Sequence, residues 1–259
     1  MDDDTIGFPE FHKDARQKLR PLQTAARTFL QIGQDMMNIP VSGQLPDLVK
    51  QITQTAANSM ESVLLLVCNG CGVDALKIDR TMFESAVILH YLDEHPGLAK
   101  DFIDFLWVKR KRHYDYLVNS APGNANRIPP EKLREILENY ERVRPRFTDK
   151  KGKVRNSWCK ASLKEMAEEV GGQSMYGGVY SLGSSMMHTD ILAIVAGADE
   201  SENVQPVPST ANLQLALQAA IMSYALVLTA FNKIAGLGRG ANLEVALAKF
   251  GGAGLCWDS

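Results

Sequence analysis

The feature that most constrains the fold of this chain is a stretch of thirty residues, from Asn203 to Asn232, without a charged side chain. Its apolar part, LQLALQAAIMSYALVLTAF, has about the length that a membrane span requires. However, Gln214, Gln218 and Ser223 interrupt it, and no basic cluster flanks it. A helix that is apolar on all sides is typical of the centre of a helical bundle. We therefore expect a buried central helix and no membrane span.

The rest of the chain shows helical periodicity, and no run alternates β-branched residues. The apolar spacing and the positions of Pro and Gly predict helices over residues 11–37, 46–67, 74–94, 96–119, 130–144, 162–171, 176–188 and 243–250. These elements predict an all-α, multi-helix bundle. We expect an N-terminal helical arm over residues 1–70 packed on a main helical bundle over residues 71–259, the two forming one continuous domain.

Composition favours a soluble protein of the cytoplasm. Hydrophobic residues make up 45% of the chain and charged residues 22%, as in ordinary globular domains. The net charge of −2 argues against a molecule that attracts nucleic acid or anionic lipid as a whole. Four cysteines do not form a disulfide framework, which favours a reducing compartment. The acidic N-terminus, MDDDTIGFPEFHKD, lacks the basic start and apolar run of a secretory signal.

The stretch YGGVYSLGSSMMH contains the first candidate site. Every fourth residue is polar: Tyr176, Tyr180, Ser184 and His188. On an α-helix this spacing places them along one stripe. They are either a core network of mutually satisfied hydrogen bonds or a site. In a site, His188 is the general acid or base, and the hydroxyls orient the ligand.

Arg80 and Glu84 form the second candidate. They share a helix face with Val87 and Tyr91, which are apolar or aromatic. An Arg N-terminal to a Glu is also the less favoured order for an exposed helical pair. We therefore expect a partly buried ion pair. It either ties two helices together or lets Arg80 bind an anion that Glu84 orients.

The basic run KRKRH, residues 109–113, precedes Tyr114 and Tyr116 and is similar to a phosphate-binding patch. Consecutive helical residues point about 100° apart, so the run wraps around the helix. We interpret it as a solvated face, with Arg110 and Arg112 left as candidates for lining a groove.

Metal and redox chemistry are not indicated. The CNGC motif, Cys68 to Cys71, lacks the second pair of ligands of a zinc site and the βαβ context of a redox motif. We interpret it as two half-buried thiols at a helix end. The other potential ligands do not follow a metal-binding order on one helix face: His90, Glu94, His95 and His113. We expect no bound metal and no cofactor.

These motifs, taken in order, resemble a widespread microbial all-helical family that is known only as a domain of unknown function. The order is R-x-x-x-E, DEHPGLAKDFIDF, NSWCKASLKEMAEEVG with its Trp, and Y-x-x-x-Y-x-x-x-S-x-x-x-H. The resemblance covers about residues 60 to 195 and implies an all-helical fold with no established activity. The residues of this chain that match the motifs of the family are Arg80, Glu84, Trp158, Tyr180, Ser184 and His188.

The Arg and His pattern is also similar to that of the HEPN group of helical ribonucleases and toxins, which carry an Arg a few residues before a His. This similarity implies that His188 moves the proton of a ribose hydroxyl while an Arg stabilises the phosphorane. Ser181 and Leu182 stand where that Arg is expected, so only Arg80, from another helix, could replace it.

Three functions follow from these observations. The first is a soluble protein without catalysis whose buried polar cluster binds a small anionic ligand. The second is a HEPN-like, metal-independent endoribonuclease, toxin or defence protein, whose partner is RNA. The third is a protein-interaction module that docks through its amphipathic first helix. Helical faces also allow a homo-oligomer.

Overall fold

In the computed structural model of the chain, residues 17–120, 128–187 and 212–251 are described. Within these ranges the chain is helical, and the one β pairing is an isolated bridge between Thr148 and Val154. The all-α, multi-helix prediction is therefore confirmed.

The chain divides into two compact units. Unit 1 comprises residues 1–94 and 163–259, and unit 2 comprises residues 95–162. The sequence predicts a helical arm that ends near residue 70, within one continuous domain. In the structure residues on both sides of that position belong to unit 1, because the helices before and after it pack on each other.

The helices of unit 1 are α2 (Arg20–Met37), α3 (Gln44–Cys68), α4 (Gly72–Glu94), α7 (Leu163–Glu169), α8 (Gln173–Met175), the π-helical turn η3 (Tyr176–Tyr180), α9 (Ser181–Met187), α11 (Leu213–Ala235) and α12 (Gly240–Gly251). Those of unit 2 are the short 3-10 helix η1 (Pro96–Leu98), α5 (Ala99–Ser120) and α6 (Pro130–Phe147).

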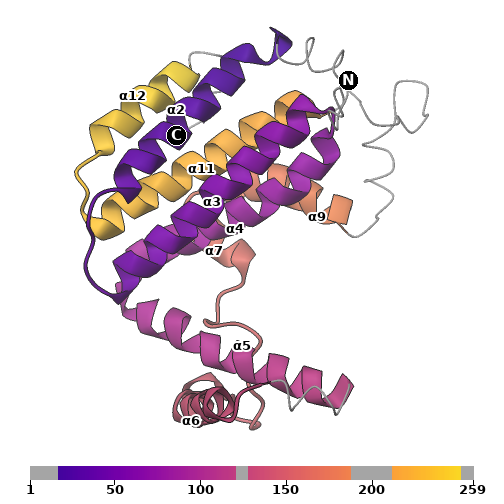
Figure 1. Cartoon of the computed structure of the whole chain (residues 1–259), viewed down its shortest axis with the longest axis vertical. Helices are drawn as coiled ribbons and strands as arrows, with labels where there is room; N and C mark the ends of the chain where they lie inside the picture. Colours follow the sequence, from indigo (N-terminus) through magenta and orange to yellow (C-terminus); the bar gives the residue numbers. More distant parts are fainter. Residues whose placement is uncertain (1–16, 121–127, 188–211, 252–259) are drawn as a thin grey trace, which may run out of the picture. The chain divides into compact units, whose positions relative to one another are not determined.

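Helix α11 is the central element of unit 1. It packs against α2, α3, α4 and α12 (Figure 1), and 13 of its 23 residues are buried. By length and composition alone α11 could cross a membrane, but in this structure 67% of its most apolar window is buried inside the protein. The prediction of a buried central helix is confirmed.

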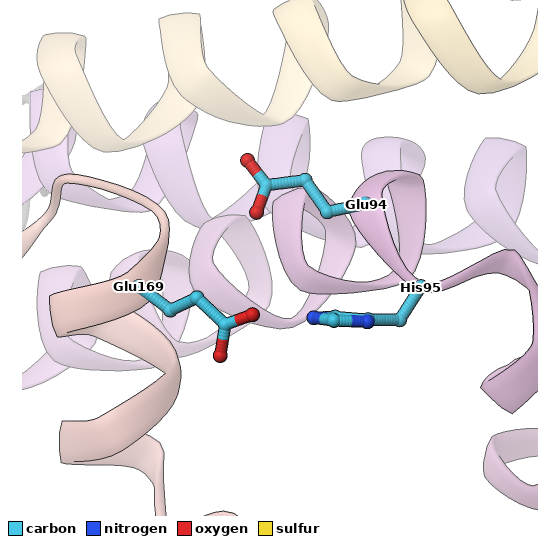
Figure 2. A group of neighbouring side chains, drawn as sticks. All are labelled: Glu94, His95 and Glu169. Atoms are coloured by element: carbon cyan, nitrogen blue, oxygen red, sulfur yellow. The ribbon is translucent and has the colours of Figure 1, made fainter.

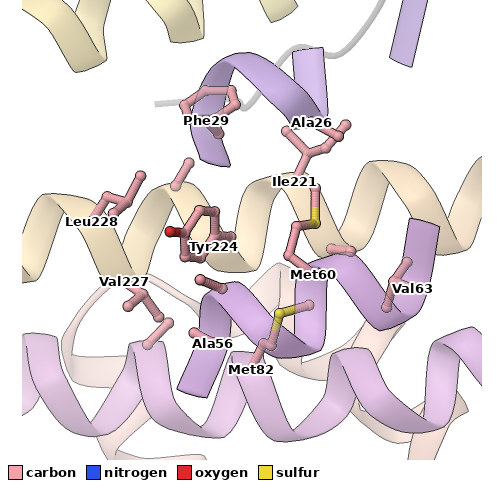
Figure 3. Close-up of a cluster of buried hydrophobic side chains, with 14 of the residues drawn as sticks. Ala26, Phe29, Ala56, Met60, Val63, Met82, Ile221, Tyr224, Val227 and Leu228 are labelled. Atoms are coloured by element: carbon pink, nitrogen blue, oxygen red, sulfur yellow. The ribbon is translucent and has the colours of Figure 1, made fainter. Parts of the chain in front are cut away.

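The core of unit 1 gathers around the middle of α11. Figure 3 shows Ile221, Tyr224 and Leu228 of α11 among side chains from three other helices, including Phe29 of α2 and Met60 of α3. All five are less than 2% exposed. Removing each large apolar side chain from water contributes about 1.5 to 3 kcal/mol, so these contacts stabilise unit 1.

A glycine on α2 makes room for Tyr224, a large side chain with a hydroxyl group in this core. A Cβ atom at Gly33 would lie 2.0 Å from the hydroxyl oxygen of Tyr224 and 3.0 Å from its Cζ atom. The Tyr224 hydroxyl is buried and makes no hydrogen bond to a described residue. The close approach of α2 and α11 therefore depends on the absence of a side chain at position 33.

Unit 2 is a pair of packed helices, α5 and α6, with the segment that follows them. The rings of Phe105 and Phe147 meet edge to face with centroids 5.1 Å apart. Asp104 is buried and pairs with Arg146 of α6 and with Lys100 one turn away. Burial alone would raise the pKa of Asp104, but Lys100 and Arg146 lower it below its ordinary value, so the carboxylate stays charged.

The Gly33→Ala substitution is expected to lower the free energy of unfolding by about 1 to 3 kcal/mol, because the new methyl group overlaps the Tyr224 hydroxyl. Urea unfolding would measure the loss. In the Gly33→Ala/Tyr224→Phe double variant part of the stability should return, since the overlapping oxygen is gone. If the double variant is no more stable than Gly33→Ala, the steric explanation is wrong.

Candidate functional site

The tyrosines of the first candidate lie on a distorted helix. Sequence analysis expected one regular helix through residues 176–188, but α8 ends at Met175 and a π-helical turn follows. Gly177 and Gly178, two poor helix formers, lie within that turn. The rings of Tyr176 and Tyr180 stack, with centroids 4.7 Å apart and planes 20° from parallel. A π-turn inside a helix is frequently found at functional sites.

Helix α9 lies directly against α4 because Gly183 has no side chain. A Cβ atom there would lie 2.8 Å from the carbonyl oxygen of Leu76 and 3.1 Å from the Cβ atom of Arg80. This contact brings the segment with Tyr176 and Tyr180 onto the face of α4 that carries Arg80.

Arg80 is the centre of the candidate site. Its Nη2 atom lies 3.0 Å from a carboxylate oxygen of Glu84 and donates to the hydroxyl of Tyr180 at 3.3 Å. Its Nη1 atom donates to the sulfur of Met187 at 3.0 Å, and the guanidinium lies 4.9 Å from the centre of the Tyr180 ring. The exposed fractions of the Arg80 and Glu84 side chains are 18% and 34%. The expected partly buried ion pair is thus present.

The surroundings of Arg80 keep it charged. Burial alone would lower the pKa of Arg80, but the Tyr180 hydroxyl and the Glu84 carboxylate raise it above its ordinary value. Burial and the neighbouring Tyr180 raise the pKa of Tyr176, so its hydroxyl keeps its proton. The Nε atom of Arg80 is buried without a hydrogen-bond partner in the described part of the chain.

The structure therefore brings Arg80, Glu84 and Tyr180 together, with Tyr176 stacked on Tyr180. Ser184 is half-buried on α9, one turn beyond Tyr180. His188, the predicted general acid or base, lies outside the described residues, so its role stays a prediction.

A groove of about 580 Å³ lies beside this cluster, lined by α3, α4 and the end of α9. Its lining residues are Thr55, Asn58, Ser59, Ser62, Lys77, Ile78, Thr81 and Met187. Met187 therefore both lines the groove and contacts Arg80. Sequence analysis missed this groove, because residues that are far apart in the sequence form its walls.

Three hydroxyls of the groove already use their protons in hydrogen bonds. The hydroxyls of Thr55, Ser62 and Thr81 donate their protons to backbone carbonyls of their own helices, at 2.7 to 3.0 Å. Their oxygens remain available to accept hydrogen bonds from a ligand. Lys77, which pairs with the exposed Asp74 at 2.7 Å, is the cation of the lining.

Asp79 is a buried acid that sequence analysis also missed. It is fully buried, and neither carboxylate oxygen makes a hydrogen bond with good geometry to a described residue. Burial raises the pKa of Asp79 to about 7, and Ser223 of α11 offsets that rise in part. The spacing of Asp79 from Leu76 and Phe83, three and four residues away, could have placed it on the core face of α4.

Two other candidates have structural roles. Arg112 donates to the backbone carbonyls of Val154 and Arg155 at 3.0 and 2.7 Å, and Arg110 lies over the ring of Trp107 at 4.7 Å. The guanidinium of Arg112 thus fixes the loop after α6, and Arg110 packs on its own helix.

The CNGC motif ends α3. Gly70 adopts a φ of 73°, which a glycine allows, and the amide of Cys71 donates to the carbonyl of Leu66 at 2.9 Å. Cys68 and Cys71 are half-buried free thiols, as expected. Burial, and next Asp74, raise the pKa of the Cys71 thiol, which disfavours the reactive thiolate.

Two carboxylates of unit 1 lie close together. Oxygens of Glu94, at the end of α4, and of Glu169, at the end of α7, are within 4.8 Å of each other, and Figure 2 draws them with His95, the residue after Glu94. Carboxylates and imidazole are possible metal ligands. Both glutamates are exposed, and both Glu169 and His95 already interact with other groups of the protein. The absence of a metal therefore stays a prediction.

The chain matches the model of a family of unknown function, DUF5677, over residues 48–204. This match covers more than half of the chain, so the protein belongs to that family. It contains all four segments on which the resemblance was based. No curated protein and no solved structure matches the chain.

The Asp79→Asn variant is expected to gain stability over the wild type as the pH rises. The unfolded chain loses the Asp79 proton near pH 3.8, whereas the folded protein keeps it to about pH 7. The wild type therefore loses free energy of unfolding between these pH values, by a few kcal/mol in total. The asparagine has no proton to lose. Urea unfolding at about pH 5 and about pH 8 would measure the difference.

The matched control is Asp74→Asn, which removes an exposed acid from the same helix. Its stability relative to the wild type should not rise with pH in this way. The pKa of His90 is lowered, chiefly by burial, but this histidine affects the wild type and both variants alike. An equal gain for Asp79→Asn at both pH values would contradict the prediction.

Proposed function

We propose that unit 1 binds a small anion that carries hydroxyl groups, in the groove beside Arg80, and that it does so without catalysis. The observation that carries this proposal is the double role of Met187, which lines the groove and contacts the Arg80 guanidinium. Lys77, which lines the groove, adds a second positive charge near that of Arg80.

The contacts of Arg80 indicate which of its donors a ligand would use. Nη2 is occupied by the Glu84 carboxylate and the Tyr180 hydroxyl, which hold the guanidinium in place. Nη1 has only a thioether sulfur as its partner in the described residues, and sulfur is a weak acceptor. An anionic oxygen that replaces the Met187 sulfur would form a stronger, charge-assisted hydrogen bond.

The lining of the groove supports a hydroxyl-bearing ligand. Thr55, Ser62 and Thr81 present oxygens whose protons are already donated to the backbone. Such oxygens accept hydrogen bonds from ligand hydroxyls, while Lys77 and Arg80 attract the anionic group.

In the wild type, glycerol 3-phosphate is expected to raise the melting temperature by a few degrees when it is present well above its Kd. In Arg80→Gln this ligand-induced rise should disappear, whereas Lys249→Gln, an exposed control on α12, should keep it. Differential scanning fluorimetry measures the shift within each variant, so a change in basal stability does not obscure the result. A full shift in Arg80→Gln would contradict the proposal.

A specific observation favours a second candidate, the HEPN-like ribonuclease. Met187, the residue before His188, is in contact with Arg80. An arginine from α4 therefore contacts the residue that precedes the predicted general base. In this candidate function, that arginine takes the place of the one missing near His188.

If this second candidate is correct, the protein should cleave a fluorescently labelled RNA in the presence of EDTA. His188→Ala and Arg80→Ala should each lower the cleavage rate by about a hundredfold or more, the usual contribution of an acid–base or charge-stabilising group. Gel electrophoresis of the labelled RNA gives the rates. RNA that stays intact with the wild-type protein would exclude this activity under those conditions.

The third candidate, an interaction module that docks through its first helix, receives less support. In α2 the apolar residues Leu22, Phe29 and Met36 are buried, and α2 packs on α3, α11 and α12. That face is therefore used within unit 1 and is not available to a partner.

A further inference from the structure

The two units carry opposite net charges, which the net charge of the whole chain conceals. Residues 95–162, unit 2, contain 16 Lys and Arg but 8 Asp and Glu, a net charge of +8. Unit 1 contains 12 Lys and Arg but 22 Asp and Glu, a net charge of −10. Unit 2 is thus a strongly basic module within a weakly acidic chain, which is a typical electrostatic sign of a polyanion-binding region.

The positive charge of unit 2 is concentrated in its last third. Residues 142–160 contain eight Lys and Arg and a single acid, Asp149. Some of these cations have structural roles: Arg146 pairs with Asp101 at 2.6 Å and with Asp104, and Arg155 donates to the carbonyls of Arg146 and Trp158. They hold α5, α6 and the following loop together.

Arg142 and Arg144 also form ion pairs, with Asp104 and Glu141. The four lysines of this segment are not neutralised. Lys150, Lys151, Lys153 and Lys160 are exposed, and none forms an ion pair with any residue that the structure describes. Three of them lie in the turn Asp149–Lys153, which we name the lysine turn.

The lysine turn has a defined shape. One carboxylate oxygen of Asp149 accepts hydrogen bonds from the backbone amides of Lys151 and Lys153, at 2.8 and 2.9 Å. Gly152 adopts a φ of 79°, and Thr148 and Val154 pair across the base of the turn. These contacts use backbone groups and Asp149, so the lysine side chains remain free while the backbone that presents them is fixed.

The basic run of α5 is adjacent to this turn. The guanidinium of Arg112 donates to the carbonyls of Val154 and Arg155, immediately after the turn. On the exposed face of α5, Lys109 adds a further cation and Tyr116 an aromatic side chain that is 68% exposed. Cations interleaved with an exposed aromatic ring are typical of surfaces that contact a phosphate backbone and stack on a base.

We propose that unit 2 binds nucleic acid through its phosphate backbone, with Lys150, Lys151 and Lys153 of the lysine turn as the principal contacts. An anionic membrane is the less favoured partner, because the turn DKKGK has no apolar side chain to insert below the headgroups. This inference concerns unit 2 alone and does not depend on the anion site proposed for unit 1.

Fluorescence anisotropy with the full-length protein and a fluorescein-labelled single-stranded RNA of about twenty nucleotides tests the proposal. Binding should weaken linearly in log Kd against log salt between about 50 and 300 mM NaCl. The triple variant Lys150→Glu/Lys151→Glu/Lys153→Glu should bind at least about tenfold more weakly at the low-salt end. Its salt slope should be smaller by about 2, since each lost phosphate contact on a single strand contributes about 0.7.

Two further variants show whether position or total charge matters. Lys18→Glu/Lys164→Glu/Lys249→Glu changes the net charge equally, at exposed lysines of unit 1, and should bind nearly as well as the wild type. Replacing the three turn lysines by Arg should preserve binding. Circular dichroism of each variant confirms that it is folded.

Three results would overturn the proposal. The first is no salt-dependent binding of the wild type to the RNA or to a duplex DNA of the same length. The second is an equal loss in the two charge-reversed triple variants, which would indicate a non-specific effect of net charge. The third is sedimentation with phosphatidylserine vesicles in the absence of RNA binding, which would assign the lysine turn to a membrane surface.

Discussion

The burial of α11 is the constraint on which the rest of unit 1 depends. Contact between water and the apolar sides of such a long uncharged helix is unfavourable, so other helices must cover it. In this chain α2, α3, α4 and α12 do so. Alanines such as Ala216 and Ala220 and the glycine at position 33 allow these helices to approach closely, and Tyr224 fills the space that Gly33 leaves.

The candidate site follows from the position of α4 in this arrangement. One side of α4 packs on α11 and buries Asp79, while the adjoining side contacts α9 and carries Arg80. Among the described residues no cation pairs with Asp79, and its pKa is raised, whereas Glu84 and Tyr180 stabilise the charge of Arg80. The charged form of Asp79 is thus disfavoured because Asp79 faces an apolar core. The charged form of Arg80 is favoured because Arg80 faces polar groups. The groove beside Arg80 is formed where α3 and α9 meet the same helix.

Because the two units carry opposite net charges, they differ in how they attract an anion. Unit 1 is acidic overall, so the attraction of an anion there depends on local cations such as Lys77 and Arg80. Unit 2 is basic overall, and the lysine turn concentrates that charge on a short segment of fixed backbone. Net charge calculated over the whole chain averages these opposite contributions, which is why the sequence argument against nucleic acid did not apply to the separate units.

The sequence by itself determined the helical class, the central helix and the ion pair, since hydrophobic periodicity and the order of charges are local properties of the chain. It identified Arg80, Glu84, Tyr176 and Tyr180 as neighbours on their own helices. Only the tertiary structure decided that Arg80 contacts Tyr180, that a π-turn interrupts the expected helix, and that the compact units meet at residues 94 and 162 of the chain. The groove and the full burial of Asp79 also became evident only in the tertiary structure. Contacts between residues a hundred positions apart depend on how helices pack, and local spacing carries no information about that packing.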